Sequence, residues 1–257
     1  LAVGGGSSMD VAKVVAVLLA GDQDLPALYG VDQVAGGRLP LILVPTTAGT
    51  GSEVTPVAVI TTGETTKAGV SSAVLLPDVA ILDAELTLGL PPRITAMTGV
   101  DAMVHAIEAY TSKLRKNPVS DTLARSALTL LAENIRTAVC RGDDREARSA
   151  MLLGAMQAGQ AFANAPVAAV HALAYPLGGH YHIPHGLSNS LVLPAVLRFN
   201  LPAACAHYAE LAELVVGPGL AGSDEARATA LIEGLERLIR ELELPPTLAE
   251  AAVPEAD

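Results

Sequence analysis

Hydrophobic residues form short continuous runs in the first third of the chain. They lie at residues 1–3, 41–44, 57–61 and 79–82, each bounded by glycine, proline, threonine or acidic residues. Short apolar runs without strict alternation are typical of strands that are buried on both faces of a sheet. Residues 9–19 carry apolar positions on most faces, which predicts a buried helix. The pattern therefore predicts an α/β region whose sheet is covered on both faces.

The pattern changes at residues 91–93, a Pro-Pro-Arg segment. Beyond it, apolar residues recur at three- and four-residue intervals, the period of an amphipathic helix. Strand-like runs nearly disappear, residues 191–193 being the one ambiguous case. We therefore expect a boundary near residue 90, between an α/β part over 1–90 and an all-helical part over 91–257. The predicted helices cover residues 93–112, 119–138, 144–164, 167–179, 186–199, 202–214 and 223–243.

Composition and charge narrow the class of protein. A formal net charge of −11 argues against nucleic acid or an anionic membrane surface as a partner. No apolar run reaches the 18 residues that predict a membrane span. Cys140 and Cys205 are isolated, so we expect reduced thiols and a cytoplasmic protein. The chain starts inside a strand-like run and stops just after Pro254, so we expect both ends to be truncation points.

Histidine and aspartate residues supply the candidate chemistry. Asp101 and His105 are four residues apart in a predicted helix, which places both side chains on one face. His171 and His185 lie in a second, histidine-rich segment. Three imidazoles and one carboxylate would complete a ligand set for a divalent transition metal. Spacing alone leaves competing ligands open, namely His180, His182 and His207.

Each of these candidates also has a structural interpretation. A single histidine in an apolar helix is more often a hydrogen-bonded core residue than a metal ligand. Asp101 alone could cap a helix or pair with Arg93. The combination favours the metal, because an acidic residue and a histidine four positions apart are followed by a second segment that holds several histidines.

Two polar turns follow predicted strands. The glycine turn at residues 4–7 opens a helix, where backbone N–H groups can bind a phosphate, although it lacks the GxGxxG pattern. The alternative is a tight turn in which Ser7 or Ser8 caps the helix. A threonine-rich loop at residues 46–52 follows the second strand, at the end where open α/β sheets bind ligands. Its alternative is a polar surface connection.

Five motifs run along the chain in one order. They are GGGSSMD at 4–10, PTTAGTGSE at 45–53, LLPDVAILD at 75–83, GVDAMVHAIE at 99–108 and the block from His171 to Gly186. Together they resemble the iron-containing (group III) alcohol dehydrogenase family, across essentially the whole chain. The resemblance implies a dehydroquinate synthase-like architecture. An incomplete Rossmann-like nucleotide-binding part over 1–90 would precede an all-helical metal-binding domain over 91–257, with the metal in the cleft between them.

The resemblance also implies a site, position by position. The implied metal ligands, usually for Fe²⁺ and with Zn²⁺ or another divalent ion as the alternative, are Asp101, His105, His171 and His185. The implied contacts to NAD(H), with NADP(H) left open, are Gly5, Gly6, Ser7, Asp10, Thr46, Thr47, Thr50 and Lys67. This choice makes His180 and His182 non-ligands that line the cleft.

The activity that the resemblance implies is reversible hydride transfer between a small alcohol or aldehyde and NAD(P). Its alternatives are a maleylacetate reductase, a glycerol dehydrogenase-like enzyme, or a dehydroquinate synthase-like lyase. We expect a homo-oligomer, with a dimer as the simplest form, and leave open whether this fragment is active alone.

Tyr175 stands where many members of that family carry a histidine suspected of relaying protons. Because the ordinary pKa of a phenol lies near 10, we expect Tyr175 to shape the pocket and not to control proton release.

Overall fold

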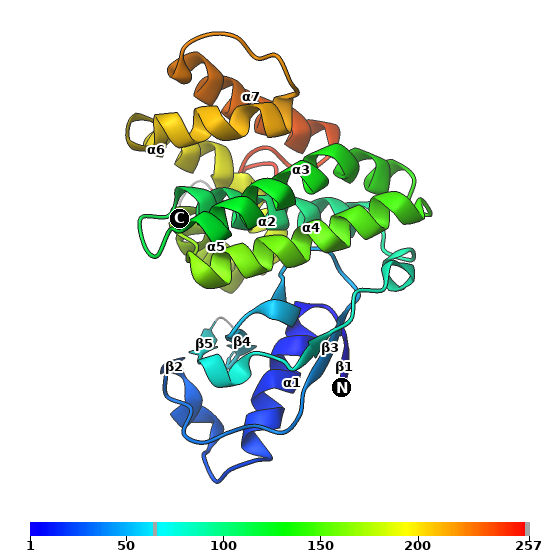
Figure 1. Cartoon of the computed structure of the whole chain (residues 1–257), viewed down its shortest axis with the longest axis vertical. Coiled ribbons are helices and arrows are strands. Elements are labelled where there is room, and N and C mark those ends of the chain that lie inside the picture. The colour runs from blue at the N-terminus through cyan, green and yellow to red at the C-terminus, as the bar shows by residue number, and fades with distance from the viewer. Residues whose placement is uncertain (64–65, 255–257) are drawn as a thin grey trace.

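A computed structural model describes residues 1–63 and 66–254. It places an α/β part at one end and a larger helical part at the other (Figure 1). The α/β part contains β1 (Ala2–Gly4), α1 (Gly6–Leu18), β2 (Gly30–Val31), β3 (Ile42–Pro45), β4 (Val57–Thr61), β5 (Lys67–Ser71) and β6 (Val79–Ala80). The helical part contains α2 (Pro92–Thr111), α3 (Pro118–Cys140), α4 (Arg145–Asn164), α5 (Ala169–His180), α6 (His185–Val216) and α7 (Asp224–Glu241). The predicted fold class is confirmed. No helix among the described residues is long and apolar enough to cross a membrane.

The described strands form two small sheets. One is parallel with the order β1-β3-β6, in which Val3 lies opposite Val44. The other has the order β2-β5-β4, where β4 and β5 form an antiparallel pair. The sequence predicted neither β2, which is two residues long, nor β5, which has no apolar run. Lys67, one of the implied cofactor contacts, is therefore the first residue of a strand.

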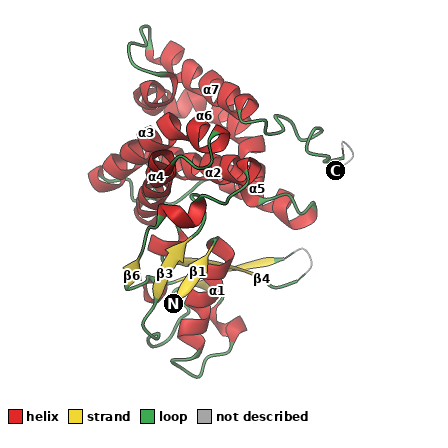
Figure 2. Cartoon of the chain, turned by 90° about the vertical axis from the view of Figure 1, so that its right-hand side faces the viewer, coloured by secondary structure: helices red, strands yellow, loops and turns green. Residues whose placement is uncertain are grey.

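Helix α1 covers one face of the parallel sheet, where Met9 and Ala16 pack with Leu43 (Figure 2). Alternating strand residues point to opposite faces. On the other face, four apolar side chains remain 36–54% exposed, namely Val3, Ile42, Val79 and Ile81. The expectation of a sheet covered on both faces is therefore wrong for the described residues.

Helix α2 is the buried centre of the helical part. Its residues from 95 to 110 are all buried except Thr98, because it carries apolar side chains on every face and α3, α4 and α6 pack around it. Side-chain caps begin two of these surrounding helices: Asn117 starts α3 in a capping box with Ser120, and Asp144 starts α4. The core therefore surrounds the helix that carries the first two candidate ligands.

Helix α6 is a single helix where the sequence predicted two, at 186–199 and 202–214. Pro194 and Pro202 lie inside it, and each lacks the N–H group that an interior helical position normally donates. Buried side chains before and after Pro202, Leu197 and Tyr208 among them, belong to one hydrophobic core. This packing outweighs the local tendency of proline to break the helix.

Glycines bring the threonine-rich loop into direct contact with the helical part. Gly51 has a positive φ of 60°, and a Cβ at this position would lie 2.5 Å from the Cα of Gly159 in α4. A Cβ at Gly49 would lie 2.8 Å from the Cβ of Thr98 in α2. Neither position has room for a side chain. The contact therefore holds the carboxyl end of β3 against the two helices.

We expect Gly159→Ala to destabilise the protein, although alanine is the better helix former by about 1 kcal/mol. The added Cβ would lie 2.8 Å from the Cα of Gly51, and such overpacking costs about 1–3 kcal/mol. Thermal unfolding measures the effect. Gly178→Ala in α5 is the matched control, because its Cβ would lie 3.5 Å from the nearest atom, the carbonyl oxygen of Ile183. A Gly159→Ala variant that melts at or above the wild-type temperature would contradict the prediction.

Candidate metal centre and the adjoining sheet edge

Four side chains from three helices converge in the helical part. Asp101 and His105 come from α2, His171 from the first turn of α5, and His185 is the first residue of α6. One candidate ligand atom from each lies within 4.8 Å of the others. Gly186 makes the approach possible, because a Cβ there would lie 2.2 Å from the carbonyl oxygen of Met97 in α2. We call these four residues the ligand group.

The spacing of the ligand group suits one ion. The Oδ1 atom of Asp101 lies 3.8 Å from Nε2 of His171 and 3.5 Å from Nε2 of His185. In a tetrahedral site with metal bonds of about 2.1 Å, neighbouring donor atoms are roughly 3.4 Å apart. The rings of His105 and His171 stack with their centroids 4.6 Å apart, and Phe162 stacks on His105 at 4.5 Å.

Burial sets the protonation of the ligand group. Burial alone would raise the pKa of Asp101, but the imidazoles and the Asn189 amide around it lower that pKa on balance. Burial lowers the pKa of His105 to about 4, against the opposing effect of Asp101, and also lowers the pKa of His185. These directions favour a charged Asp101 carboxylate beside neutral imidazoles at His105 and His185, the forms in which such side chains bind metals.

Two further residues contact the ligand group, and the sequence prediction missed both. Glu108 is buried, and its Oε2 atom lies 2.6 Å from Nδ1 of His171. Asn189 is also buried and donates from Nδ2 to Oδ1 of Asp101 at 2.5 Å. Helical spacing was the available signal: Glu108 follows His105 by three residues and Asn189 follows His185 by four, so each pair shares a face.

The charges of the site fit a divalent cation. Asp101 and Glu108 are 2% and 4% exposed, yet no lysine or arginine among the described residues forms an ion pair with either. Each ionised carboxylate contributes one negative charge, and buried charge of this kind requires a partner. Within the described structure, Nδ1 of His105 is also buried without a hydrogen-bond partner.

The competing histidines lie elsewhere. His180 and His182 are exposed, and His207 meets the ring of Tyr110 edge-on at 5.9 Å. None of the three belongs to the ligand group. The two interpretations of Asp101 as a helix cap or a partner of Arg93 also fail, because its carboxylate faces the imidazoles and Asn189.

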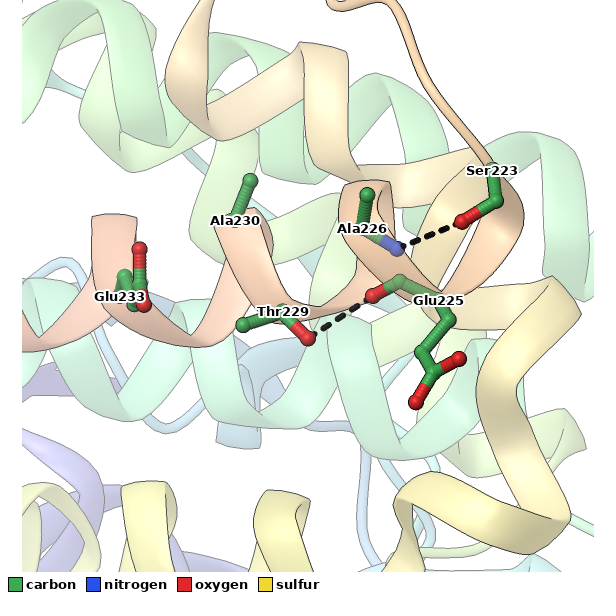
Figure 3. Close-up of a pocket in the computed structure, with 6 residues that line it drawn as sticks. All are labelled: Ser223, Glu225, Ala226, Thr229, Ala230 and Glu233. Atoms are coloured by element: carbon green, nitrogen blue, oxygen red, sulfur yellow. Dashed lines mark hydrogen bonds between the residues drawn. The ribbon is translucent and has the colours of Figure 1, made fainter.

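Tyr175 separates the ligand group from a cavity of about 590 Å³ between α5 and the β4–β5 pair. Its ring lies 5.9 Å from that of His185, and the cavity lining includes Lys67 and His180. Burial, reinforced by the Asp101 carboxylate, raises the pKa of Tyr175. A second hollow of about 420 Å³ lies along α7 (Figure 3), and none of its lining residues belongs to a helix that carries the ligand group.

The two predicted cofactor turns lie side by side at the carboxyl edge of the parallel sheet. The N–H of Thr46 donates to the carbonyl oxygen of Gly4 at 2.9 Å, and a Cβ at Gly6 would lie 2.7 Å from Thr50. A Cβ at Gly5 would lie 3.5 Å from Oγ1 of Thr47, and Gly5 stands at the N-cap of α1 without a side-chain cap. The interpretation of Ser7 or Ser8 as the cap is therefore wrong. The free helix N-terminus suits an anion.

Asp10 links α1 to the segment that follows the threonine-rich loop. Its carboxylate accepts the Ser52 hydroxyl at 2.6 Å and the Val59 N–H at 2.9 Å. One turn later, the fully buried Lys13 donates to the carbonyl oxygens of Thr55 and Val57 at 2.9 and 2.7 Å. These bonds anchor α1 to residues 52–59. Direct contact between Asp10 and a cofactor stays a prediction.

Comparison with known proteins places this geometry in a family. Residues 1–84 match the model of iron-containing alcohol dehydrogenases, and residues 95–257 match the C-terminal model of the Fe-containing alcohol dehydrogenase family. The chain belongs to the iron-containing alcohol dehydrogenase family. The family match covers both the sheet edge and the ligand group.

Individual members of the family are similar along the whole chain. Long-chain-alcohol dehydrogenase 1 of Geobacillus thermodenitrificans is 44% identical over 100% of this chain and 65% of its own length. The crystal structure of a 1,3-propanediol oxidoreductase superposes with a TM-score of 0.95 at 41% identity, over 99% of this chain and 67% of that one. The sulfoacetaldehyde reductase of Bifidobacterium kashiwanohense in complex with NAD⁺ has a TM-score of 0.88 at 34% identity, over 99% and 66%. The chain thus spans about two thirds of the length of these relatives.

We expect His105→Ala to weaken Zn²⁺ or Fe²⁺ binding by at least about 100-fold, because it removes one ligand from a buried site. Elemental analysis and competition with a chromophoric chelator measure the loss. His207→Ala is the control, since His207 lies outside the ligand group. If metal binding survived His105→Ala and disappeared in His182→Ala instead, the ligand group would be wrong.

The buried Glu53, which directly follows the threonine-rich loop, should make the stability of the protein depend on pH. Burial raises its pKa from 4.5 to about 7. A carboxyl whose folded-state pKa is raised contributes stability below about pH 4.5 that is lost as the pH rises through 7. We therefore expect the free energy of unfolding to fall by roughly 2 kcal/mol between pH 5 and 7.5, and Glu53→Gln to remove that fall. Urea unfolding at both pH values is the check, and identical pH profiles for the two proteins would refute it.

Proposed function

We propose that the protein is a metal-dependent alcohol dehydrogenase that transfers hydride reversibly between a small alcohol or aldehyde and NAD(H). The observation that carries this proposal is the position of the ligand group next to the cavity. Tyr175 lies between them, because its ring is beside that of His185 and it lines the cavity together with Lys67. Family membership supports the reaction type, and the NAD⁺ complex of the similar sulfoacetaldehyde reductase supports the cofactor. We propose Fe²⁺ as the metal on the same family grounds.

Each part of the site has a distinct task in this proposal. Asp101, His105, His171 and His185 hold the metal, which when bound supplies the Lewis acidity that acidifies an alcohol and polarises an aldehyde carbonyl. Gly5, Gly6 and Ser7, at the start of α1, offer backbone N–H groups to the cofactor pyrophosphate.

Side chains near the glycine turn, the cavity and the ligand group orient the reactants in this proposal. Thr46, Thr47 and Thr50 border the pyrophosphate turn, and Lys67 lies on the cavity wall, where its charge reaches the ribose end of a nucleotide. Tyr175 and Phe162 place aromatic rings beside the ligand group, which limits the access of water to the reacting atoms. We further propose a cytoplasmic homo-oligomer. The free cysteines Cys140 and Cys205 support a cytoplasmic location, because thiols stay reduced there.

The decisive experiment is elemental analysis of anaerobically purified protein, combined with NADH- and NADPH-dependent reduction of a panel of short aldehydes. We expect about one divalent metal ion per chain, with NADH oxidation that disappears on treatment with a chelator and in Asp101→Asn. A protein with no bound metal and no activity with either cofactor would overturn the proposed function.

Tyr175→Phe tests the role of the cavity wall. Because burial raises the pKa of this phenol, we expect Phe to keep turnover within about threefold of wild type, with an unchanged pH–rate profile and metal content. Tyr175→Ala, which removes the ring, should instead raise KM. Turnover abolished in Tyr175→Phe while the metal stays bound would show that the hydroxyl itself is needed.

A further inference from the structure

Glu108 contacts the ligand group without belonging to it. We propose that Glu108 is a positioning residue that fixes the tautomer of His171 and gives the buried site the second negative charge that selects a doubly charged cation. The inference rests on the proposed metal-dependent function and deepens it. It follows from three features of the structure: the hydrogen bonds of the carboxylate, the cap that it provides to α5, and the charge balance of the core.

The hydrogen bonds determine where the imidazole proton lies. A carboxylate can only accept hydrogen bonds, so the 2.6 Å contact from Oε2 places the proton of His171 on Nδ1. The other oxygen, Oε1, accepts the N–H of Val170 at 2.7 Å, which prevents the carboxylate from turning away. The lone pair of His171 then remains on Nε2, the atom that faces Asp101. Such a carboxylate–histidine pair orients a metal ligand and raises its basicity.

The same carboxylate replaces the missing cap of α5. Ala168 stands at the N-cap of this helix and has no side-chain oxygen to offer its first N–H groups. Glu108 reaches across from α2 and accepts the N–H of Val170, the second residue of α5. A negative charge at a helix N-terminus is favourable. One side chain thus fixes both the start of α5 and the ring that α5 presents to the site.

Charge balance supplies the third argument. Asp101 and Glu108 are both buried, and Asn189 donates to Asp101 without adding charge. Among the described residues, the buried cations Lys13 and Arg148 bond elsewhere, to Thr55 and Thr95. The two carboxylates therefore have no lysine or arginine beside them in the described structure, and a divalent ion would balance their two negative charges. Without the charge of Glu108, the same four ligands would be balanced by a single positive charge.

Charge and geometry can be separated by two substitutions at this position. Glu108→Gln keeps the size and one acceptor oxygen but removes the charge. Glu108→Asp keeps the charge but shortens the reach to His171 and Val170. Glu210→Gln is the matched control. Glu210 accepts a hydrogen bond from the hydroxyl of Tyr110, which lies two residues after Glu108 in α2, and Glu210 is outside the ligand group.

The experiment measures Zn²⁺ affinity of the purified protein by competition with a chromophoric chelator. We expect Glu108→Gln to bind Zn²⁺ about 10–100-fold more weakly than wild type. The Zn²⁺ affinity of Glu108→Asp should lie between those of wild type and Glu108→Gln. The affinity of Glu210→Gln should stay within about twofold of wild type. Folded Glu108→Gln protein that binds within twofold of wild type would overturn the proposal. Equal weakening in the Asp and Gln variants would reject its charge component.

A second measurement keeps the proposal testable if the variants do not fold. Nitrogen-15 NMR of the Zn²⁺-loaded wild-type protein should find the His171 proton on Nδ1, and a proton absent from Nδ1 would refute the assignment. The proposed function fails separately. A protein whose Zn²⁺ affinity depends on Glu108 but which reduces no aldehyde would reject the dehydrogenase activity and leave the role of Glu108 standing.

Discussion

Two carboxylates on the buried stretch of α2 constrain the rest of the helical part. Asp101 and Glu108 lie two turns apart on α2, where neither can be solvated. Each is stable there only because other helices deliver polar partners to it: α5 brings the N–H of Val170 and the ring of His171, and α6 brings Asn189. The placement of α5 and of the start of α6 therefore follows from the need to compensate buried charge, as much as from hydrophobic packing.

A second constraint fixes the distance between the metal centre and the sheet edge. The contact between Gly51 and Gly159 leaves no room for a side chain, so the threonine-rich loop and α4 meet backbone to backbone. Asp10 and Lys13 hold the other side of this loop through bonds to residues 52–59. The loop is thus held from both sides, and small shifts of α1 cannot be absorbed there. The proposed hydride transfer would need such rigidity, because the reacting atoms must be held at close range.

Sequence patterns found the parts of the site that repeat locally. The i, i+4 spacing of Asp101 and His105 follows from helix geometry alone, whereas the choice of His171 and His185 over His180 and His182 came from the family resemblance. The role of Glu108 does not follow from its motif, because a glutamate on a helix is usually solvated and only the tertiary fold brings His171 of α5 to its carboxylate. The continuity of α6 through Pro202 likewise depends on contacts made far away in the sequence.

Charge also explains why the choice of metal is separate from the integrity of the site. Fe²⁺, Zn²⁺ and Mn²⁺ carry the same charge and accept imidazole and carboxylate ligands, so each balances Asp101 and Glu108 equally well. What distinguishes them is coordination geometry and supply, and neither alters the helices that the buried carboxylates hold together. Exchange among these ions would therefore leave the charge balance of the core unchanged, whereas the stabilisation that each ion gives would follow its affinity for the site. The candidate centre is therefore defined by its charge and its donor atoms, which several divalent ions can match.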